Sequence, residues 1–269
     1  MIKLGIFGNP VEHSKSPLMQ NSALKSLAIE GFYDKYLLLD GSKIKDEFKK
    51  LDLNGANITV PHKEEAFKNA DEVRGIASKI GAVNTYVKED NKVVAYNTDA
   101  PGFMKAIEEF GDIKSACILG AGGTARAIAV ALKDAGIEVT VINRSREGRL
   151  EFFENLGCIC YTTDEISISV TQSLSHSVTL VINTTSAGLK DDLLPVTKEL
   201  LKQLFKNSKF AFDCIYGKIT PFLAMAREMN VKYKDGKDML LYQGVLALEL
   251  FLGTKVTQST IKQMDKCLK

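Results

Sequence analysis

The sequence places a glycine-rich turn between a strand-like segment and a helix-like segment, where a phosphate-bearing ligand can bind. Residues 120–126 read Gly-Ala-Gly-Gly-Thr-Ala-Arg, which fits the pattern G-x-G-x-x-A at Gly120, Gly122 and Ala125. The first glycine permits a tight turn, the second lets the backbone approach a pyrophosphate, and the small third residue allows close helix–strand packing. The N–H groups at the helix start attract the phosphates. Because the turn lies in a strand–helix–strand context, we favour cofactor binding over a turn without a ligand.

The end of the following strand indicates which dinucleotide binds. An NAD site has an Asp or Glu about 20 residues after the glycine turn, where it accepts the ribose 2′-hydroxyl. Here the strand end reads Asn143-Arg144-Ser145-Arg146, Arg149 follows, and no carboxylate appears before Glu147. A solvated basic helix start is the alternative, although positive charge there opposes the helix dipole. Three guanidinium groups favour a 2′-phosphate, so the sequence predicts NADP(H).

Two serines near the N-terminus form the next polar group. Ser14 and Ser16 lie two residues apart, just before Pro17 and a helix-like segment. Hydroxyl groups and free N–H groups at a helix start can hold a carboxylate. A plain helix cap would explain one of these serines but not both.

A lysine and three other polar residues stand at predicted strand ends. Thr59 and Lys63 belong to the segment at 57–63, where a strand ends and a helix begins, and Asn84 and Asp99 likewise fall at strand ends. Such a lysine is often only an exposed side chain. However, a helix start and partial burial both disfavour the charged ammonium form of a lysine. A lysine that exchanges protons in catalysis needs an environment of this kind.

Short apolar runs and helix-like segments alternate along the chain and position these residues. We predict strands at 3–7, 33–39, 55–60, 82–87, 92–96, 115–119, 138–142, 178–183 and 210–214, with helices between most of them. Residues 90–91 read as a hairpin turn, and the helix from about 239 is apolar nearly all round, which predicts burial. The Ser/Thr-rich stretch 162–177 allows no assignment.

Composition narrows the function classes. The chain has 269 residues, which corresponds to about two domains, and 45% of them are hydrophobic. A net charge of +2 gives no broad basic surface for nucleic acid. The five cysteines form no C-x-x-C, so no zinc or redox motif is predicted, and no cluster suggests any other metal. The apolar stretch at 239–252 is too short for a membrane span of about 20 residues. Without an export signal, we expect a cytoplasmic protein.

Seven motifs, in order along nearly the whole chain, resemble those of the shikimate dehydrogenases. They are Ser14-Lys15-Ser16-Pro17, Asn57-Ile58-Thr59-Val60-Pro61-His62-Lys63, Ala82-Val83-Asn84-Thr85, Asn97-Thr98-Asp99, Gly120-Ala121-Gly122-Gly123, Asn143-Arg144-Ser145 and Asp235-Gly236 followed by Gln243.

The resemblance implies a fold and an activity. It implies an N-terminal α/β substrate domain, residues 1–100 completed by 237–269, and a Rossmann-type NADP-binding domain, residues 101–236. The active site is expected in the cleft between them, with domain closure bringing nicotinamide to substrate. The implied reaction is the reversible NADPH-dependent reduction of 3-dehydroshikimate to shikimate, a step of chorismate and aromatic amino acid biosynthesis.

The resemblance also assigns roles to residues. Lys63 would carry the proton, and Asp99 would orient it and contact substrate. The residues implied to bind substrate are Ser14, Ser16, Thr59, Asn84, Asp99, Tyr216 and Gln243. The residues implied to bind cofactor are Gly120, Ala121, Gly122, Gly123, Thr124, Asn143, Arg144, Ser145, Cys214 and Gly236.

Two departures from the family pattern and several alternatives remain. Ala100 stands where the family usually has Gly, and Lys237-Asp238 stands where many relatives have Leu-Gly. The alternatives are a quinate/shikimate dehydrogenase with relaxed cofactor use, a methylene-tetrahydrofolate dehydrogenase and a non-catalytic NADP(H)-binding sensor. The paired serines argue against the second, and the presence of both Lys63 and Asp99 argues against the third. We expect a small-molecule substrate and a monomer or homodimer.

Overall fold

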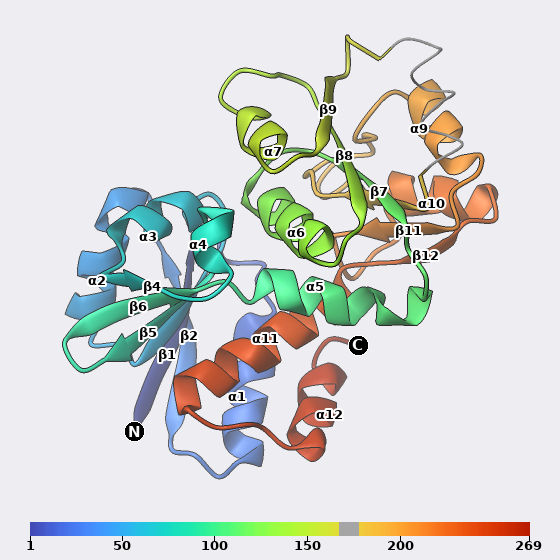
Figure 1. Ribbon diagram of the computed structural model, residues 1–269. Coiled ribbons are helices and arrows are strands. Elements are labelled where there is room, and N and C mark those ends of the chain that lie inside the picture. The colour runs from blue at the N-terminus through green and yellow to red at the C-terminus, as the bar shows by residue number, and fades with distance from the viewer. Residues whose placement is uncertain (167–177) are drawn as a thin grey trace. The chain divides into compact units, whose positions relative to one another are not determined.

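A computed structural model describes residues 1–166 and 178–269, which form two α/β units (Figure 1). One unit comprises Met1–Phe103 with Leu240–Lys269, and the other comprises Met104–Met239. The breaks fall within α5 (Asp99–Ile107) and α11 (Lys237–Leu252), a few residues from the boundaries expected at 100 and 237. Among the described residues, no helix is long and apolar enough to cross a membrane.

The first unit is built on a mixed six-stranded sheet. Its strands are β1 (Ile2–Gly8), β2 (Gly31–Leu37), β3 (Gly55–Ile58), β4 (Glu72–Val73), β5 (Thr85–Glu89) and β6 (Lys92–Tyr96), in the order β2-β1-β3-β5-β6-β4. Only β5 runs antiparallel to its neighbours β3 and β6. The predicted hairpin is confirmed, because Glu89 pairs with Lys92 and Asp90 takes a φ of 52°.

Strand direction brings several polar loops to one edge of this sheet. The start of β5 lies at the same edge as the carboxyl ends of β1, β3 and β6, because β5 alone is reversed. Asn84 precedes β5, Thr59 follows β3 and Asp99 follows β6. Residues predicted at separate strand ends therefore share this edge, which is hereafter called the polar edge.

Helices cover both faces of the mixed sheet. One face is covered by α1 (Ser16–Ser26), α11 and α12 (Gln258–Lys266), and the other by α2 (Ile44–Lys50), α3 (Lys63–Asn69) and α4 (Ala77–Ile80), which η1 (Gly41–Lys43) precedes (Figure 1). The predicted burial of the last apolar helix is confirmed, since Leu241, Val245 and Leu248 pack with β1 residues in one core cluster. Gly55 makes this packing possible, because a Cβ there would lie 2.2 Å from Cδ1 of Phe251.

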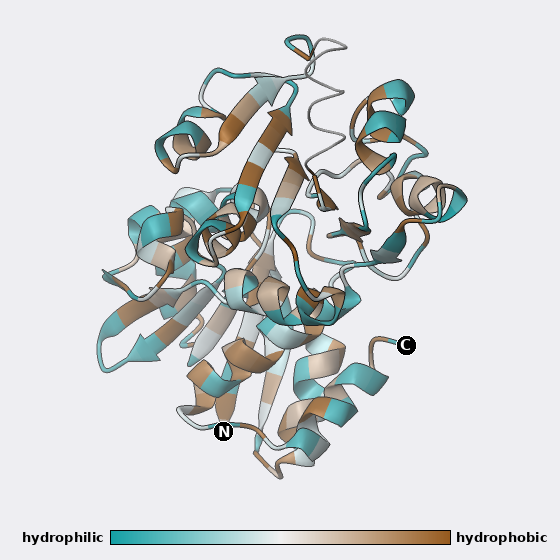
Figure 2. Cartoon of the chain, turned by 45° about the vertical axis from the view of Figure 1, so that its right-hand side comes forward, coloured by the Kyte–Doolittle hydropathy of each residue, from teal (hydrophilic) through white to brown (hydrophobic). Residues whose placement is uncertain are grey.

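The described strands of the second unit form a parallel six-stranded sheet. They are β7 (Ser115–Leu119), β8 (Glu138–Asn143), β9 (Ile159–Thr162), β10 (Leu180–Asn183), β11 (Phe210–Asp213) and β12 (Lys232–Lys234), in the order β12-β11-β10-β7-β8-β9. Counted from β7, this is the strand order 3-2-1-4-5-6 of dinucleotide-binding folds. The central strands are mostly apolar and buried (Figure 2).

The helices that the structure describes in this unit lie on opposite sides of its sheet (Figure 1). They are α6 (Gly123–Asp134) and α7 (Glu151–Asn155) on one side, and α9 (Lys198–Phe205) and α10 (Pro221–Glu228) on the other, while η2 (Glu108–Phe110) continues α5. The sequence did not predict β4, β9 or β12. Most of the unassigned stretch 162–177 lies outside the described residues.

The packing of α11 on the mixed sheet can be tested at Gly55. We expect Gly55→Ala to lower the free energy of unfolding by about 1–3 kcal/mol, because its methyl group would overlap the Phe251 ring. Adding Phe251→Leu should make the Gly55→Ala cost smaller. Urea unfolding of both single variants and the double variant measures this, and an equal cost of Gly55→Ala in both backgrounds would contradict the packing.

Candidate active site

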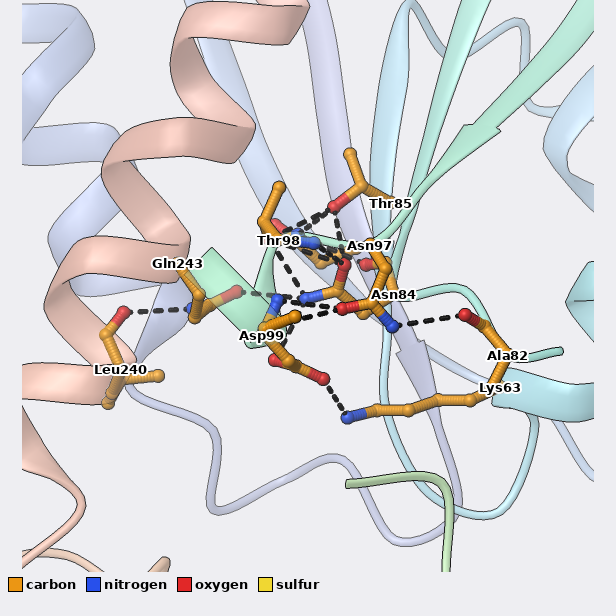
Figure 3. A network of polar contacts seen from close by, with 11 residues as sticks. Lys63, Ala82, Asn84, Thr85, Asn97, Thr98, Asp99, Leu240 and Gln243 are labelled. Carbon is orange, nitrogen blue, oxygen red and sulfur yellow. Dashed lines mark hydrogen bonds and ion pairs between the residues drawn. The ribbon is translucent and has the colours of Figure 1, made fainter. Parts of the chain in front are cut away.

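An almost buried ion pair lies at the polar edge of the mixed sheet. Lys63 begins α3 and Asp99 begins α5, and Nζ of the lysine lies 2.5 Å from Oδ2 of the aspartate (Figure 3). Only 11% of the lysine side chain and 9% of the aspartate side chain are exposed. The structure therefore brings together the two residues that were predicted to form the acid/base pair.

Asn84 fixes the second oxygen of Asp99. Its Nδ2 donates to Oδ1 of Asp99 and to Oγ1 of Thr98, each over 2.9 Å, while its own Oδ1 accepts from the Thr98 N–H over 2.8 Å. Asp99 thus has one oxygen bound to an amide and the other to an ammonium group, which sets the orientation of the carboxylate.

The backbone at Asp99 is held by Asn97. The side-chain oxygen of Asn97 accepts from the N–H groups of Asp99, over 3.0 Å, and Ala100, over 3.2 Å, at the start of α5. Its Nδ2 donates to the carbonyl of Ala82 over 3.0 Å. Ala100 is fully buried in this first turn, so alanine fits where the family usually has glycine.

Gln243 reaches the polar edge from α11. Its Oε1 accepts from Nδ2 of Asn84 over 3.4 Å, and its Nε2 donates to the carbonyl of Leu240 over 2.9 Å (Figure 3). A Cβ at Gly102 would lie 2.8 Å from the backbone nitrogen of Gln243. The glycine in α5 therefore lets α11 approach closely enough to place the amide beside Asn84.

The predicted carboxylate-binding serines lie at the start of α1. The Ser14 hydroxyl accepts from the N–H of Ser16 over 3.2 Å, which leaves the Ser14 proton available to donate. Ser16 is buried and is the first residue of the helix. Thr59 packs against Gly8 at the end of β1, where a Cβ would lie 2.4 Å from the threonine Cγ2.

Tyr33 and Asn57 form a second set of hydrogen bonds that supports Asn84. The hydroxyl of the buried Tyr33 donates to Oδ1 of Asn57 over 2.8 Å, and Nδ2 of Asn57 donates to the carbonyl of Asn84 over 3.2 Å. Burial raises the pKa of Tyr33 well above its usual value, so its hydroxyl remains a donor. The sequence did not single out Tyr33, and Asn57 appeared only within a quoted motif.

The glycine turn of the second unit has the form that a dinucleotide requires. Gly120 takes a φ of +105°, and a Cβ there would lie 2.7 Å from Oγ1 of Thr184. Gly122 precedes α6 with open space around it and, as the N-cap residue, makes no side-chain cap at that helix start. Ala125 is fully buried under the turn. These features fit a pyrophosphate at the N-terminus of α6, with Ala121, Gly123 and Thr124 in the same turn.

The arginine-rich end of β8 differs from expectation at one position. Arg146 is paired with Glu165 over 2.8 Å and also with Glu154, so its guanidinium is already engaged. Arg144 and Arg149 are exposed and make no ion pair with any residue in the described ranges. Two guanidinium groups, rather than three, are therefore available for a 2′-phosphate. Asn143 donates from Nδ2 to the carbonyl of Ser145 over 2.9 Å and shapes this corner.

The loop after β11 brings Cys214 and Gly236 together. A Cβ at Gly236 would lie 2.3 Å from the carbonyl oxygen of Cys214, and the N–H of Gly236 donates to the Ile215 carbonyl over 3.0 Å. Asp235 accepts from the N–H of Gly217, next to the half-buried Tyr216, over 3.0 Å. The close approach explains the glycine at 236.

Asp238, one of the two charged residues that depart from the family pattern, has a partner in this unit. Asp238 lies 2.5 Å from Nζ of Lys234, which donates to the Ala106 carbonyl over 3.0 Å. In the described part of the chain, no group of three or more His, Cys, Asp or Glu residues could hold a metal ion.

Comparison with known proteins identifies the family of this chain. Residues 6–86 match the model of the shikimate dehydrogenase substrate binding domain. A shikimate dehydrogenase (NADP(+)) from Helicobacter hepaticus is 46% identical over 258 residues, which cover 96% of this chain and 93% of that protein. The chain belongs to the shikimate dehydrogenase family.

Solved structures of family members have the same fold. The crystal structure of shikimate 5-dehydrogenase from Thermus thermophilus, in complex with NADP(H) and shikimate, has a TM-score of 0.85 at 33% identity and full coverage of both chains. The Aquifex aeolicus shikimate dehydrogenase structure has a TM-score of 0.86 at 32% identity and covers 98% of this chain and 97% of its own. Both similarities extend over the two units described above.

Asp213 is a buried carboxylate that the sequence analysis missed. It is the last residue of β11, is fully buried and accepts hydrogen bonds from Asn183, Ile215 and Thr220. Burial raises its pKa to about 6, although these hydrogen bonds act in the opposite direction. Its signal in the sequence was weak: Asn183 and Asp213 are polar residues that end two neighbouring apolar strands, and this pattern alone assigns no role.

The raised pKa of Asp213 predicts a pH-dependent stability. The folded protein binds this proton more tightly than the unfolded chain, so stability falls as pH rises through the interval between the two pKa values. Compared with Asp213→Asn, the unaltered protein should lose about 3 kcal/mol of unfolding free energy between about pH 4 and pH 6. Urea unfolding of both proteins across this range measures the difference, which would stay constant with pH if the carboxyl did not titrate there.

Proposed function

We propose that this protein catalyses the reversible NADPH-dependent reduction of 3-dehydroshikimate to shikimate. The observation that carries the proposal is the buried contact between Lys63 Nζ and Asp99 Oδ2, at 2.5 Å, in a chain of the shikimate dehydrogenase family. Exchange between an alcohol and a ketone moves one hydride and one proton. The cofactor supplies the hydride chemistry, and the protein must move the proton.

Lys63 is the proton carrier of this scheme. In the reductive direction it donates a proton to the oxygen that becomes the 3-hydroxyl, and in the oxidative direction it accepts that proton back. Asp99 holds the Lys63 side-chain nitrogen in place in the folded protein. The proton carrier is therefore already positioned for the transfer.

Asp99 orients Lys63 and hydrogen-bonds the substrate hydroxyl. Because Asn84 holds Oδ1 of Asp99, the carboxylate cannot rotate freely, and its second oxygen stays aimed at the lysine. The amide of Asn84 and that of Gln243 lie at the same edge and are suited to hydrogen-bond the hydroxyl groups of the substrate ring.

The remaining roles follow the family pattern. Ser14 and Ser16 bind the substrate carboxylate through hydroxyl and backbone donors at the start of α1, and Thr59 and Tyr216 complete the substrate contacts. The residues that bind NADP are Gly120 to Thr124 at the pyrophosphate, Asn143, Arg144 and Ser145 at the 2′-phosphate, and Cys214 and Gly236 at the nicotinamide end.

This activity serves chorismate and aromatic amino acid biosynthesis. None of the five cysteines forms a disulfide in the structure, which suits the reducing cytoplasm that we propose as the compartment. We propose a monomer or a homodimer as the active form.

Replacing the lysine tests the assignment of Lys63. We expect Lys63→Ala to lower turnover by roughly 10²–10⁴-fold, because the reaction loses its proton carrier. Binding of NADP⁺, measured by calorimetry, should change little. Lys68→Ala is the matched control, since Lys68 lies on the same helix and pairs with the exposed Glu65. Near-normal turnover of Lys63→Ala would refute the acid/base role.

At the end of β8, Arg144 is exposed and Arg146 is held in ion pairs, so we expect their substitutions to affect cofactor use differently. Arg144→Ala should raise the KM for NADP⁺ by about tenfold or more, since a charge-assisted bond to phosphate contributes about 1.5–3 kcal/mol. Arg146→Ala should alter this KM much less, because Glu154 and Glu165 already hold its guanidinium. Equal effects of the two substitutions would contradict the assignment.

A further inference from the structure

Asn183 and Asp213 form a buried amide–carboxylate pair outside the residues assigned above. They are the last residues of the parallel strands β10 and β11 and stand directly opposite each other in the register. Nδ2 of Asn183 donates to Oδ1 of Asp213 over 3.1 Å, and both residues are fully buried. The pair lies at the carboxyl ends of the strands, the edge at which folds of this strand order bind dinucleotides.

Asp213 holds both ends of the loop that follows β11. Its Oδ1 accepts from the N–H of Ile215 over 3.0 Å, and its Oδ2 accepts from Oγ1 of Thr220 over 2.6 Å. The Thr220 oxygen in turn accepts from the N–H of Leu223 and so caps α10. One carboxylate therefore fixes the segment at 214–217, which carries Cys214 and Tyr216.

Asn183 holds the segment that follows β10. Its Oδ1 accepts from the N–H of Thr185 over 3.0 Å and from the Thr185 hydroxyl over 2.8 Å. The Thr185 oxygen accepts from the N–H of Ala187 over 3.2 Å. This segment is also the surface on which the glycine turn rests, since a Cβ at Gly120 would meet both Thr184 and Thr185.

We propose that Asn183 and Asp213 are positioning residues that keep the pyrophosphate turn and the nicotinamide-end loop in fixed register for NADP binding. The contacts run without a break from Gly120 through Thr185, Asn183 and Asp213 to Ile215. The assignment of those two ends to the cofactor rests on the proposed function. Neither residue of the pair touches the cofactor in this scheme, and each acts through the backbone that it holds.

The chemistry of the pair accounts for a carboxylate at position 213. Three donors converge on Asp213, from an amide, a backbone N–H and a hydroxyl, and a carboxylate has the lone pairs to accept all of them. Asparagine keeps one oxygen for Asn183 and Ile215, whereas its amide would have to donate to Thr220. Alanine would leave all three donors unpaired in a buried site.

The same sheet offers a matched control at its opposite edge. Ser115, the first residue of β7, accepts from the N–H of Thr179 over 3.0 Å and lies 3.2 Å from the Thr179 hydroxyl oxygen. Ser115→Ala thus removes a polar link next to the start of β10 without altering the carboxyl ends of the strands. It separates a general loss of sheet stability from a loss of positioning.

Hydrogen exchange tests the positioning without any ligand. We expect Asp213→Ala to increase amide exchange in both 184–188 and 214–217, while Asp213→Asn has a smaller effect and Ser115→Ala changes neither segment. Increased exchange confined to 214–217 would overturn the claim that the pair links the two segments. Because this measurement needs neither substrate nor turnover, its outcome does not depend on the proposed reaction.

Cofactor binding provides the functional readout. Asp213→Ala should weaken NADP⁺ binding by about tenfold or more at a temperature where the variant is fully folded, since buried donors lose their partner. Asp213→Asn should restore most of the affinity, and Ser115→Ala should match the unaltered protein even if its Tm falls. Unchanged NADP⁺ affinity in Asp213→Ala would overturn the proposal. Failure of the proposed function would instead appear as an unaltered protein that binds NADP⁺ but does not turn over shikimate.

Discussion

The buried ion pair of Lys63 and Asp99 is the interaction on which the rest of the polar edge depends. Charges with about a tenth of their side-chain surface exposed are costly unless they are paired and hydrogen-bonded. Asp99 begins α5, where a negative charge is favourable, but Lys63 begins α3, where a positive charge is not. The carboxylate offsets this cost, and Asn84 and Asn97 keep the carboxylate in place. The ion pair therefore fixes the position of the Lys63 side chain at the polar edge.

The reversal of one strand makes this arrangement possible. In an all-parallel sheet, Asn84 would precede its strand at the edge opposite to Thr59 and Asp99. Because β5 is antiparallel to both neighbours, its start lies beside the ends of β3 and β6. The described strands of the second unit include no such reversal, so its glycine turn, its arginine corner and the Asn183–Asp213 pair all lie at the carboxyl ends of parallel strands.

The features that the sequence predicted correctly are local ones, each set by the types and spacing of neighbouring residues. The glycine turn, the hairpin at Asp90 and the apolar helix α11 were predicted from residue type and spacing, and the structure contains all three. The family resemblance also paired Lys63 with Asp99, and the structure places the two side chains in contact. The short strands β4 and β12, of two and three residues, were too brief to leave a periodic pattern.

What the sequence could not show depends on contacts between distant segments. The pairing of Arg146 with Glu165 requires the approach of β9 to β8, and the place of Gln243 requires Gly102 on another helix. Asp213 had no sequence signal beyond ending a strand, because its role arises from one donor on β10 and two donors in the loop that follows β11. The composition of one segment does not specify which other segments it will contact in the fold.

The most direct test of the account is the initial rate of NADPH formation from shikimate and from quinate, each with NADP⁺ and with NAD⁺. The serine pair at the start of α1 and the arginines Arg144 and Arg149 together predict a strong preference for shikimate with NADP⁺. Comparable rates with quinate or NAD⁺ would contradict the specificity described here. No turnover with any combination, in a protein that still binds NADPH, would contradict the proposed dehydrogenase activity itself.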